Sequence, residues 1–257
     1  MQTRRLTPFY TSCTNPFHHL KENTMRRLSS AVAALSLVFF GTAAQATTPV
    51  LDQLTPENSM LMLIDMQPQF AFSTRSTSID SLLNNVEGLT EAAQVFKVPT
   101  LVTTITSKSF GGPVFPQIQA AAPDVEPIDR TTINAWQDSR IVDYVHKGGK
   151  EGRKKIIMAG LWTDNCVVLP ALSALKEGYE VYVVTDASGD YDTESHERAV
   201  QRLVQAGAVP ITWLPVMLEW QADWSKKETA GKVVEILSKH AGSTGLGFFY
   251  RNTMLAR

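Results

Sequence analysis

Cys166 is the residue with the clearest chemical potential in this chain, because the sequence around it predicts a strand, a sharp turn and then a helix. The apolar run 155–159 ends at Gly160, and residues 167–176 carry apolar side chains at helical spacing. Cys166 would then lie at the helix N-terminus, where free amide N–H groups and the helix dipole favour an anion. Such a position suits a nucleophile, since it eases ionisation of a thiol and supplies donors for an oxyanion. The alternative is that Cys166 is simply a small buried hydrophobic residue.

Asp65 is the second candidate, because it closes the apolar run 59–65, which is typical of a buried parallel strand. In a doubly wound sheet of strand order 3-2-1-4-5-6, strands 1 and 4 are neighbours and ligands bind outside their carboxyl ends. The strand assignment alone therefore predicts that Asp65 and Cys166 face one crevice.

Strands alternate with helices along the rest of the chain. We predict strands at 59–65, 100–105, 127–130, 155–159, 180–185 and 209–214, and helices at 79–96, 117–122, 138–147, 167–176, 195–206, 216–224 and 229–240. We expect the pair Gly148-Gly149 to end the predicted helix 138–147. The alternation predicts an α/β fold of three layers, a doubly wound parallel six-stranded sheet with helices on both faces.

Two long runs around the cysteine carry a family resemblance. They are AGLWTDNCV at 159–167 and ALSALKEGYEVYVVTDASG at 171–189. They resemble the isochorismatase-like cysteine hydrolases, whose pattern is Gly-apolar-x-Thr-Asp-x-Cys-Val, then a helix and Gly-Tyr/Phe-x-Val-x-Val-x-x-Asp-Ala. The runs INAW at 133–136 and GGPVFPQI at 111–118 are similar to the YcaC-like branch of that family.

This resemblance implies a catalytic triad of Asp65, Arg130 and Cys166. Asp65 would be the general acid and base. Arg130 stands where most of the family has Lys and the YcaC-like branch has Arg; it stays charged, so it can only hold Asp65 and stabilise negative charge. Lys108, in the loop after the second strand, is the fallback cation.

The resemblance also implies that the backbone N–H groups of Trp162 and Cys166 bind an oxyanion, and that the Leu161–Trp162 peptide bond is cis. From the helix terminus and Arg130 we expect Cys166 to ionise well below the free-thiol pKa of about 8.5.

The expected activity is hydrolysis of a small amide, ester or enol-ether-type substrate by a Cys nucleophile. Candidate substrate-pocket residues are Gln67, Phe70, Asn134, Trp136 and Trp162. Loops 107–116 and 131–138 would shape the pocket. One alternative is a non-catalytic binding or thiol-redox protein on the same fold, and the runner-up enzyme is a Cys–His protease with His196 as base.

We expect no metal and no cofactor. The related nicotinamidases hold a divalent ion through histidines downstream of the first strand, whereas residues 66–110 contain no histidine. The fingerprints of nucleotide binding, Gly-x-Gly-x-x-Gly and the P-loop, are also missing from the sequence.

The N-terminus has the features of a secretory signal peptide. Met25-Arg26-Arg27 is followed by the apolar stretch 31–40 and by Ala44-Gln45-Ala46, a cleavage pattern. We assign 1–46 to this region, with Met25 as an alternative start of translation, and expect export to the periplasm or secretion without a membrane anchor after cleavage. Removal also takes away Cys13 and leaves Cys166 as the sole cysteine.

The 257 residues, of which 44% are hydrophobic, suffice for one domain of about 200 residues, which we place at 47–242 with a tail at 243–257. Of 24 basic and 25 acidic residues, the signal region removes five and one, which leaves 19 against 24 and a formal charge of −5. That charge argues against nucleic acid as a partner. We expect a homo-oligomer whose subunits pack through the Trp-rich region 213–224, because aromatic residues are enriched where subunits meet.

Overall fold

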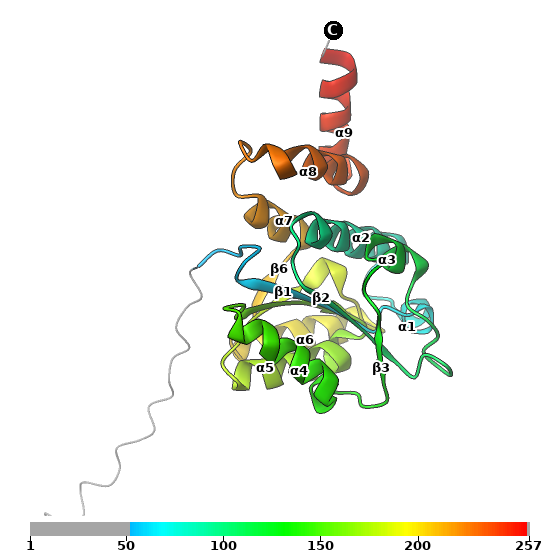
Figure 1. Cartoon of the computed structure of the whole chain (residues 1–257). Helices are drawn as coiled ribbons and strands as arrows, with labels where there is room; N and C mark the ends of the chain where they lie inside the picture. Colours follow the sequence, from blue (N-terminus) through cyan, green and yellow to red (C-terminus); the bar gives the residue numbers. More distant parts are fainter. Residues whose placement is uncertain (1–51, 256–257) are drawn as a thin grey trace, which may run out of the picture. The chain divides into compact units, whose positions relative to one another are not determined.

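The computed structural model describes residues 52–255; the predicted signal region 1–46 lies outside the described residues. Six parallel strands form one sheet in the order β3-β2-β1-β4-β5-β6 (Figure 1). They are β1 Ser59–Ile64, β2 Thr100–Ile105, β3 Ile128–Arg130, β4 Lys155–Gly160, β5 Glu180–Val184 and β6 Val209–Ile211. The predicted strand order and the α/β doubly wound class are confirmed.

Helices cover both faces of the sheet, with α4, α5 and α6 on one side and α2, α3 and α7 on the other (Figure 1). The α-helices are α1 Pro68–Ser73, α2 Ile79–Val95, α3 Pro116–Ala121, α4 Ser139–Lys150, α5 Val168–Lys176, α6 Thr193–Gln205, α7 Trp213–Gln221, α8 Lys227–His240 and α9 Ser243–Tyr250. Shorter turns are the 3₁₀ segments η1 Ala135–Gln137 and η3 Thr185–Ala187 and the π-helical segments η2 Thr163–Val167 and η4 Arg251–Leu255. Helix α1 was not predicted.

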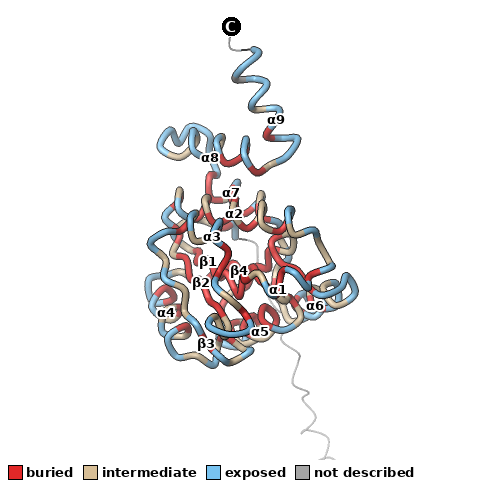
Figure 2. Tube along the Cα trace, turned by 90° about the vertical axis from the view of Figure 1, so that its right-hand side faces the viewer, coloured by how far each residue is buried: buried red, intermediate tan, exposed pale blue. Residues whose placement is uncertain are grey.

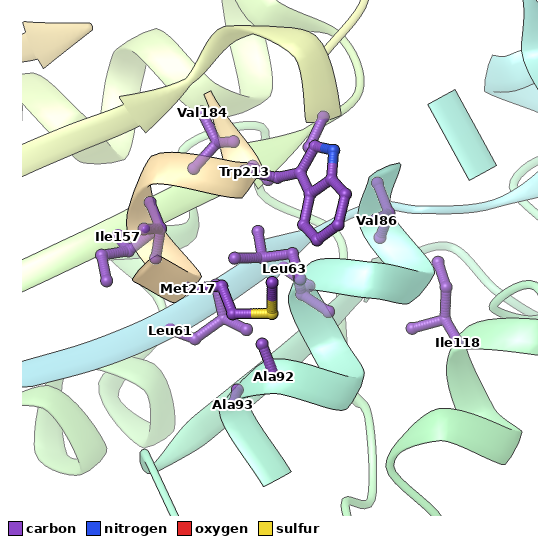
Figure 3. Close-up of a cluster of buried hydrophobic side chains, with 14 of the residues drawn as sticks. Leu61, Leu63, Val86, Ala92, Ala93, Ile118, Ile157, Val184, Trp213 and Met217 are labelled. Carbon is purple, nitrogen blue, oxygen red and sulfur yellow. The ribbon is translucent and has the colours of Figure 1, made fainter. Parts of the chain in front are cut away.

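Strand β1 is buried on both faces, as its continuous apolar sequence predicts. Leu61 and Leu63 point to the core under α2 and α7, where they meet Trp213 and Met217 (Figure 3). Met60, Met62 and Ile64 belong to the second core, under α4 and α5. The alternation of side chains along one strand thus joins the three layers, and the buried trace of the sheet runs through the middle of the domain in Figure 2.

The prediction that Gly148-Gly149 ends a helix is wrong, because α4 continues to Lys150. A Cβ on Gly148 would lie 2.3 Å from Sδ of Met60, and one on Gly149 would lie 2.5 Å from the Tyr179 hydroxyl. The two glycines therefore serve close packing of α4 on the sheet. The chain turns at Gly152 instead, where φ is +90°.

The C-terminal part differs from the prediction at two points. Strand β6 ends at Ile211 and not at residue 214, because Trp213 begins α7. The predicted tail is helical over α9 and η4, and α9 packs on α8. Trp213 and Trp220 are buried in the chain's own core, so only Trp224, at 52% exposure, is available for a subunit contact. Among the described residues, no helix is both long and apolar enough to cross a membrane.

Candidate active site

The carboxyl ends of β1, β3 and β4 bring three reactive side chains together. In the sheet register, Ile64 at the end of β1 pairs with Gly160 at the end of β4, and Ile105 at the end of β2 pairs with Arg130. Asp65 follows β1 directly, Arg130 ends β3, and Cys166 lies six residues beyond β4. The sheet register therefore determines their proximity, as the strand assignment predicted for Asp65 and Cys166.

Asp65 and Arg130 form a buried ion pair. Nη2 of Arg130 donates to Oδ2 of Asp65 at 2.7 Å, with side-chain exposures of 1% and 0%. Thr103 on β2 donates its hydroxyl to Oδ1 of Asp65 at 3.1 Å. Arg130 also donates from Nη1 to the Thr132 carbonyl oxygen, while its buried Nε makes no hydrogen bond with the described residues. Both carboxylate oxygens of Asp65 are thus held, so the group is fixed in position.

Cys166 lies in the π-helical segment η2, two residues before the start of α5, and is only 6% exposed. Burial, together with the charge and hydrogen bonding of Asp65, raises the pKa of the Cys166 thiol to about 12, against the opposing effect of Arg130. Burial likewise raises the pKa of Asp65, although Arg130 and hydrogen bonds with Cys166 and Thr103 oppose it. The site therefore favours a single negative charge on Asp65 and Cys166 together, because a second negative charge would be buried beside the first.

This geometry corrects the expectation of a thiolate with a low pKa. The helix terminus and Arg130 do favour the anion, but the chain buries the thiol against an acid that already balances the cation. A thiol whose pKa is raised in this way is in its neutral form at neutral pH.

An aromatic group lies beside the cysteine turn. Phe70 meets Trp162 edge to face, with ring centroids 5.1 Å apart, and Phe110 at 5.6 Å; Tyr191 meets Trp162 at 5.8 Å. The cis bond at Leu161–Trp162 is present. Phe70 and Trp162 were predicted pocket residues. Phe110, at 63% exposure, lies in the loop 107–116 that was predicted to shape the pocket, whereas Tyr191, at 43%, was missed because the sequence pattern does not define the path of its loop.

Gln67 does not line a pocket. It is fully buried, its Oε1 accepts from the Ile105 N–H at 2.8 Å, and its Nε2 donates to the carbonyl oxygens of Ile105 and Gly112. A Cβ on Gly111 would lie 2.3 Å from that Nε2. Gln67 therefore anchors the loop after β2, with all its polar capacity used by backbone.

Asn134 and Trp136 also have other contacts. Asn134 accepts from the Trp136 N–H and donates to the Ser173 hydroxyl. Trp136 donates from Nε1 to Glu177 at 2.8 Å, at the far end of α5 from Cys166. Since α5 has nine residues, that end lies roughly 13 Å along the helix axis, so this contact of Trp136 lies away from Cys166. The fallback cation Lys108 is exposed and interacts with Asp129.

A second group of polar residues supports the cysteine turn from behind. Asp190 is fully buried, accepts from the Asp164 N–H at 2.8 Å and from the Tyr191 N–H at 3.0 Å, and its pKa is raised by burial to about 6. Nδ1 of His196 lies 2.9 Å from the Thr163 hydroxyl. The charged groups that shift the pKa of Cys166 are Asp65 and Arg130, and His196 is not among them. A role for His196 as the base of a protease is therefore not supported. The position of Asp190 after β5 is the signal that could have drawn attention to it.

This combination of sheet order and buried residues can be compared with known proteins. The chain matches the family model of the Isochorismatase domain over residues 59–214, and it belongs to the isochorismatase family of hydrolases. It is 38% identical over 173 residues to the probable hydrolase YcaC of Escherichia coli strain K12, covering 67% of this chain and 82% of that protein.

Solved structures of YcaC proteins have the same fold. YcaC from Pseudomonas aeruginosa is 32% identical with a TM-score of 0.75, covering 80% of this chain and 100% of that one. The YcaC gene product of Escherichia coli, an octameric hydrolase of unknown specificity, is 33% identical with a TM-score of 0.75, covering 81% and 100%. The present chain is thus a YcaC-like hydrolase.

Proposed function

We propose that this hydrolase cleaves a small amide, ester or enol-ether-type substrate through a covalent intermediate on Cys166. The observation that carries the proposal is the buried arrangement of Asp65, which contacts a cation on one side and the thiol on the other. An acid so placed can take the proton of Cys166 and return it to a leaving group.

For an ester or amide the steps balance as follows. Asp65 takes the thiol proton while sulfur attacks the carbonyl carbon, and the carbonyl oxygen becomes an oxyanion beside the N–H groups of Trp162 and Cys166. Collapse expels the alcohol or amine, which receives the proton from Asp65, and leaves a thioester. Asp65 then takes a proton from water as the water oxygen attacks the thioester carbonyl carbon; the carbon–sulfur bond breaks, the carboxylic acid leaves, and Asp65 returns the proton to the sulfur of Cys166.

Arg130 contributes charge and position in this scheme. It remains cationic at every step, so it keeps Asp65 oriented and limits how far burial raises the pKa of that carboxyl. Because Asp65, Arg130 and Cys166 are 6% exposed or less, the substrate must be small. Its non-reacting part would contact Phe70 and Trp162.

A relative supplies a useful probe. The structure of YcaC from Pseudomonas aeruginosa contains covalent acrylamide. Acrylamide combines a small amide with an electrophilic alkene, so it should modify the mature chain at Cys166, the only cysteine of the described residues.

A screen of small amides, esters and enol ethers with the mature protein tests the proposal, with Cys166→Ala as the control. We expect hydrolysis that the control lacks, and a mass increase of one acrylamide per chain in the parent only. Equal turnover by parent and control would overturn the nucleophile assignment. Acrylamide modification without hydrolysis of any substrate would favour the alternative of a binding or thiol-redox protein.

We also propose that the chain forms a homo-oligomer, as the Escherichia coli YcaC octamer suggests. The described residues offer apolar surface on α9, where Leu246, Phe249 and Tyr250 are 67%, 58% and 61% exposed. Light scattering at micromolar concentration tests this, and a monomer would contradict it.

Export is a further part of the proposal, based on the sequence of residues 1–46. N-terminal sequencing of protein from a periplasmic fraction should give a start near Thr47. A chain that begins at Met1 or Met25 in the cytosol would contradict it.

A further inference from the structure

Helices α2 and α8 pack against each other and bring together polar residues that take no part in the site of Asp65 and Cys166. Glu87 and Glu91 lie one turn apart on α2, and His240 is the last residue of α8. One ligand atom from each of these three residues lies within 4.8 Å of the other two. Two carboxylates alone would be an ordinary surface feature, so the argument depends on His240.

The ring of His240 has a defined orientation. The amide Nδ2 of Asn84 donates to the carbonyl oxygen of His240 at 2.9 Å, which leaves Oδ1 of Asn84 as an acceptor. Nδ1 of His240 lies 3.1 Å from that Oδ1 and must therefore be the donor. In the neutral imidazole the other nitrogen, Nε2, then carries a lone pair.

That lone pair points at a carboxylate. Nε2 of His240 lies 3.3 Å from Oε2 of Glu91, the His240 side chain is only 2% exposed, and Nε2 makes no hydrogen bond with any of the described residues. Two electron-rich atoms at this distance need either a proton on Nε2 or a cation between them or beside them. A histidine whose second nitrogen donates to an amide oxygen is also the usual arrangement of a metal ligand.

Lys239 supplies the cation in the present arrangement. Its Nζ donates to Oε1 of Glu87 at 2.8 Å and to Oε1 of Glu91 at 2.6 Å. It leaves Oε2 of Glu91 and Nε2 of His240 facing each other, and its side chain is 53% exposed. Lys239 can therefore swing into water when a stronger cation arrives, at the cost of surface ion pairs that contribute little.

The backbone permits this approach. A Cβ on Gly88, next to Glu87, would lie 3.1 Å from Cβ of His240 and 3.0 Å from the Trp213 ring. The absence of a side chain at Gly88 lets the end of α8 come close to α2, which brings His240 within reach of both carboxylates.

We propose that Glu87, Glu91 and His240 form a divalent metal site of the zinc type. One imidazole nitrogen and two carboxylates suit Zn²⁺, with water completing the coordination, whereas Ca²⁺ and Mg²⁺ prefer oxygen ligands alone. The ion would fasten the end of α8 to α2, and α9 begins only three residues after His240. The site is separate from the hydrolytic centre and does not depend on the proposed reaction.

Calorimetric titration of the chelator-treated full mature chain with Zn²⁺ tests the site, in a Cys166→Ser background so that the thiol cannot bind zinc. We expect one binding event and a melting temperature that rises with zinc but not with Ca²⁺ or Mg²⁺. Glu91→Gln, on the partly exposed side of the group, should weaken zinc binding at least tenfold, and His240→Gln should weaken it more. Lys239→Gln should tighten it several-fold because the competing ammonium is gone.

His146→Gln is the matched control, because His146 forms an exposed pair with Glu177 at 2.8 Å. It should leave the affinity unchanged. No zinc-dependent rise in melting temperature, or equal affinity in Glu91→Gln and the parent, would overturn the site and identify the group as a His–Glu–Lys ion-pair network. Since Glu91→Gln keeps the buried ring in place, this result does not depend on whether His240→Gln folds.

Discussion

Each end of the parallel sheet holds an ion pair. We call the end where the strands begin the amino edge and the end where they finish the carboxyl edge, and the two pairs differ in what surrounds them. At the amino edge, Lys155 at the start of β4 pairs with Glu180, its register partner at the start of β5. Lys155 is 4% exposed, but Glu180 is 37% exposed and keeps contact with water. At the carboxyl edge, both Asp65 and Arg130 are buried.

The surroundings of the two pairs indicate different purposes. Nζ of Lys155 also donates to the Tyr182 hydroxyl at 3.2 Å and lies 5.4 Å from the centre of the Tyr182 ring, so the buried ammonium has polar partners besides Glu180. The other pair adjoins a buried thiol, and Nε of Arg130 has no hydrogen-bond partner within residues 52–255. Burial of two charges brings little net stability, so the carboxyl-edge pair is better explained by chemistry and the amino-edge pair by packing.

The largest expected effect concerns turnover at the carboxyl edge. Cys166→Ala should abolish covalent turnover, and Asp65→Asn should lower kcat by about 10²–10⁴-fold because proton transfer is lost. The double variant should be little worse than Cys166→Ala, because groups that serve one step do not contribute additively. Steady-state kinetics measure this. Intact turnover in Asp65→Asn would show that the mechanism is wrong.

The next largest effect should come from removal of the Arg130 cation. Arg130→Ala leaves Asp65 buried without a counterion, so we expect a loss of about 3–5 kcal/mol in the free energy of unfolding. Urea denaturation measures it, with Arg130→Lys as the charge-retaining comparison. If Arg130→Lys keeps both stability and kcat, the charge suffices; if it keeps stability only, the planar fork is needed for activity.

The protonation state of the thiol gives a third test. Because Asp65 raises the pKa of Cys166, Asp65→Asn should shift the pH midpoint of iodoacetamide alkylation downwards while it removes turnover. Arg130→Ala should shift it upwards. A midpoint near that of a free thiol in the parent would contradict the buried, neutral thiol.

At the amino edge we expect a smaller effect, confined to stability. Lys155→Met should cost about 1 kcal/mol, since Glu180 regains water. Glu180→Gln should cost more, because it leaves the buried ammonium without its carboxylate. Neither should change kcat. A loss of turnover in Lys155→Met would end the distinction between the two edges.

Asp190 should affect stability in a way that depends on pH. Its folded-state pKa of about 6 exceeds the ordinary value of 3.8 for an aspartate, so the folded chain binds the proton more tightly and the carboxyl favours folding most at low pH. The melting temperature of the parent minus that of Asp190→Asn should therefore fall as pH rises from 4 to 6 and level off above. A difference that stays constant with pH would mean that Asp190 does not titrate in this range.

The local pattern determined much of this protein. Apolar runs predicted all six strands and helical spacing predicted most helices, because these properties depend on neighbours within about ten residues. The alternation of strands and helices indicated a doubly wound sheet and therefore which strand ends meet. The motif around Cys166 indicated the family. Helix α1 was missed because PQFAFS is short and has no helical repeat to detect.

Only the tertiary structure decided the state and the partners of individual side chains. The pKa of Cys166 depends on burial and on Asp65, 101 positions away, and Gln67 is engaged by a loop that ends near Gly112. Position 148 within helix α4 needs a glycine because Met60 occupies the space that a side chain there would need. In each case the decisive energy comes from desolvation or contact between distant segments, which a sequence pattern does not contain and packing alone supplies.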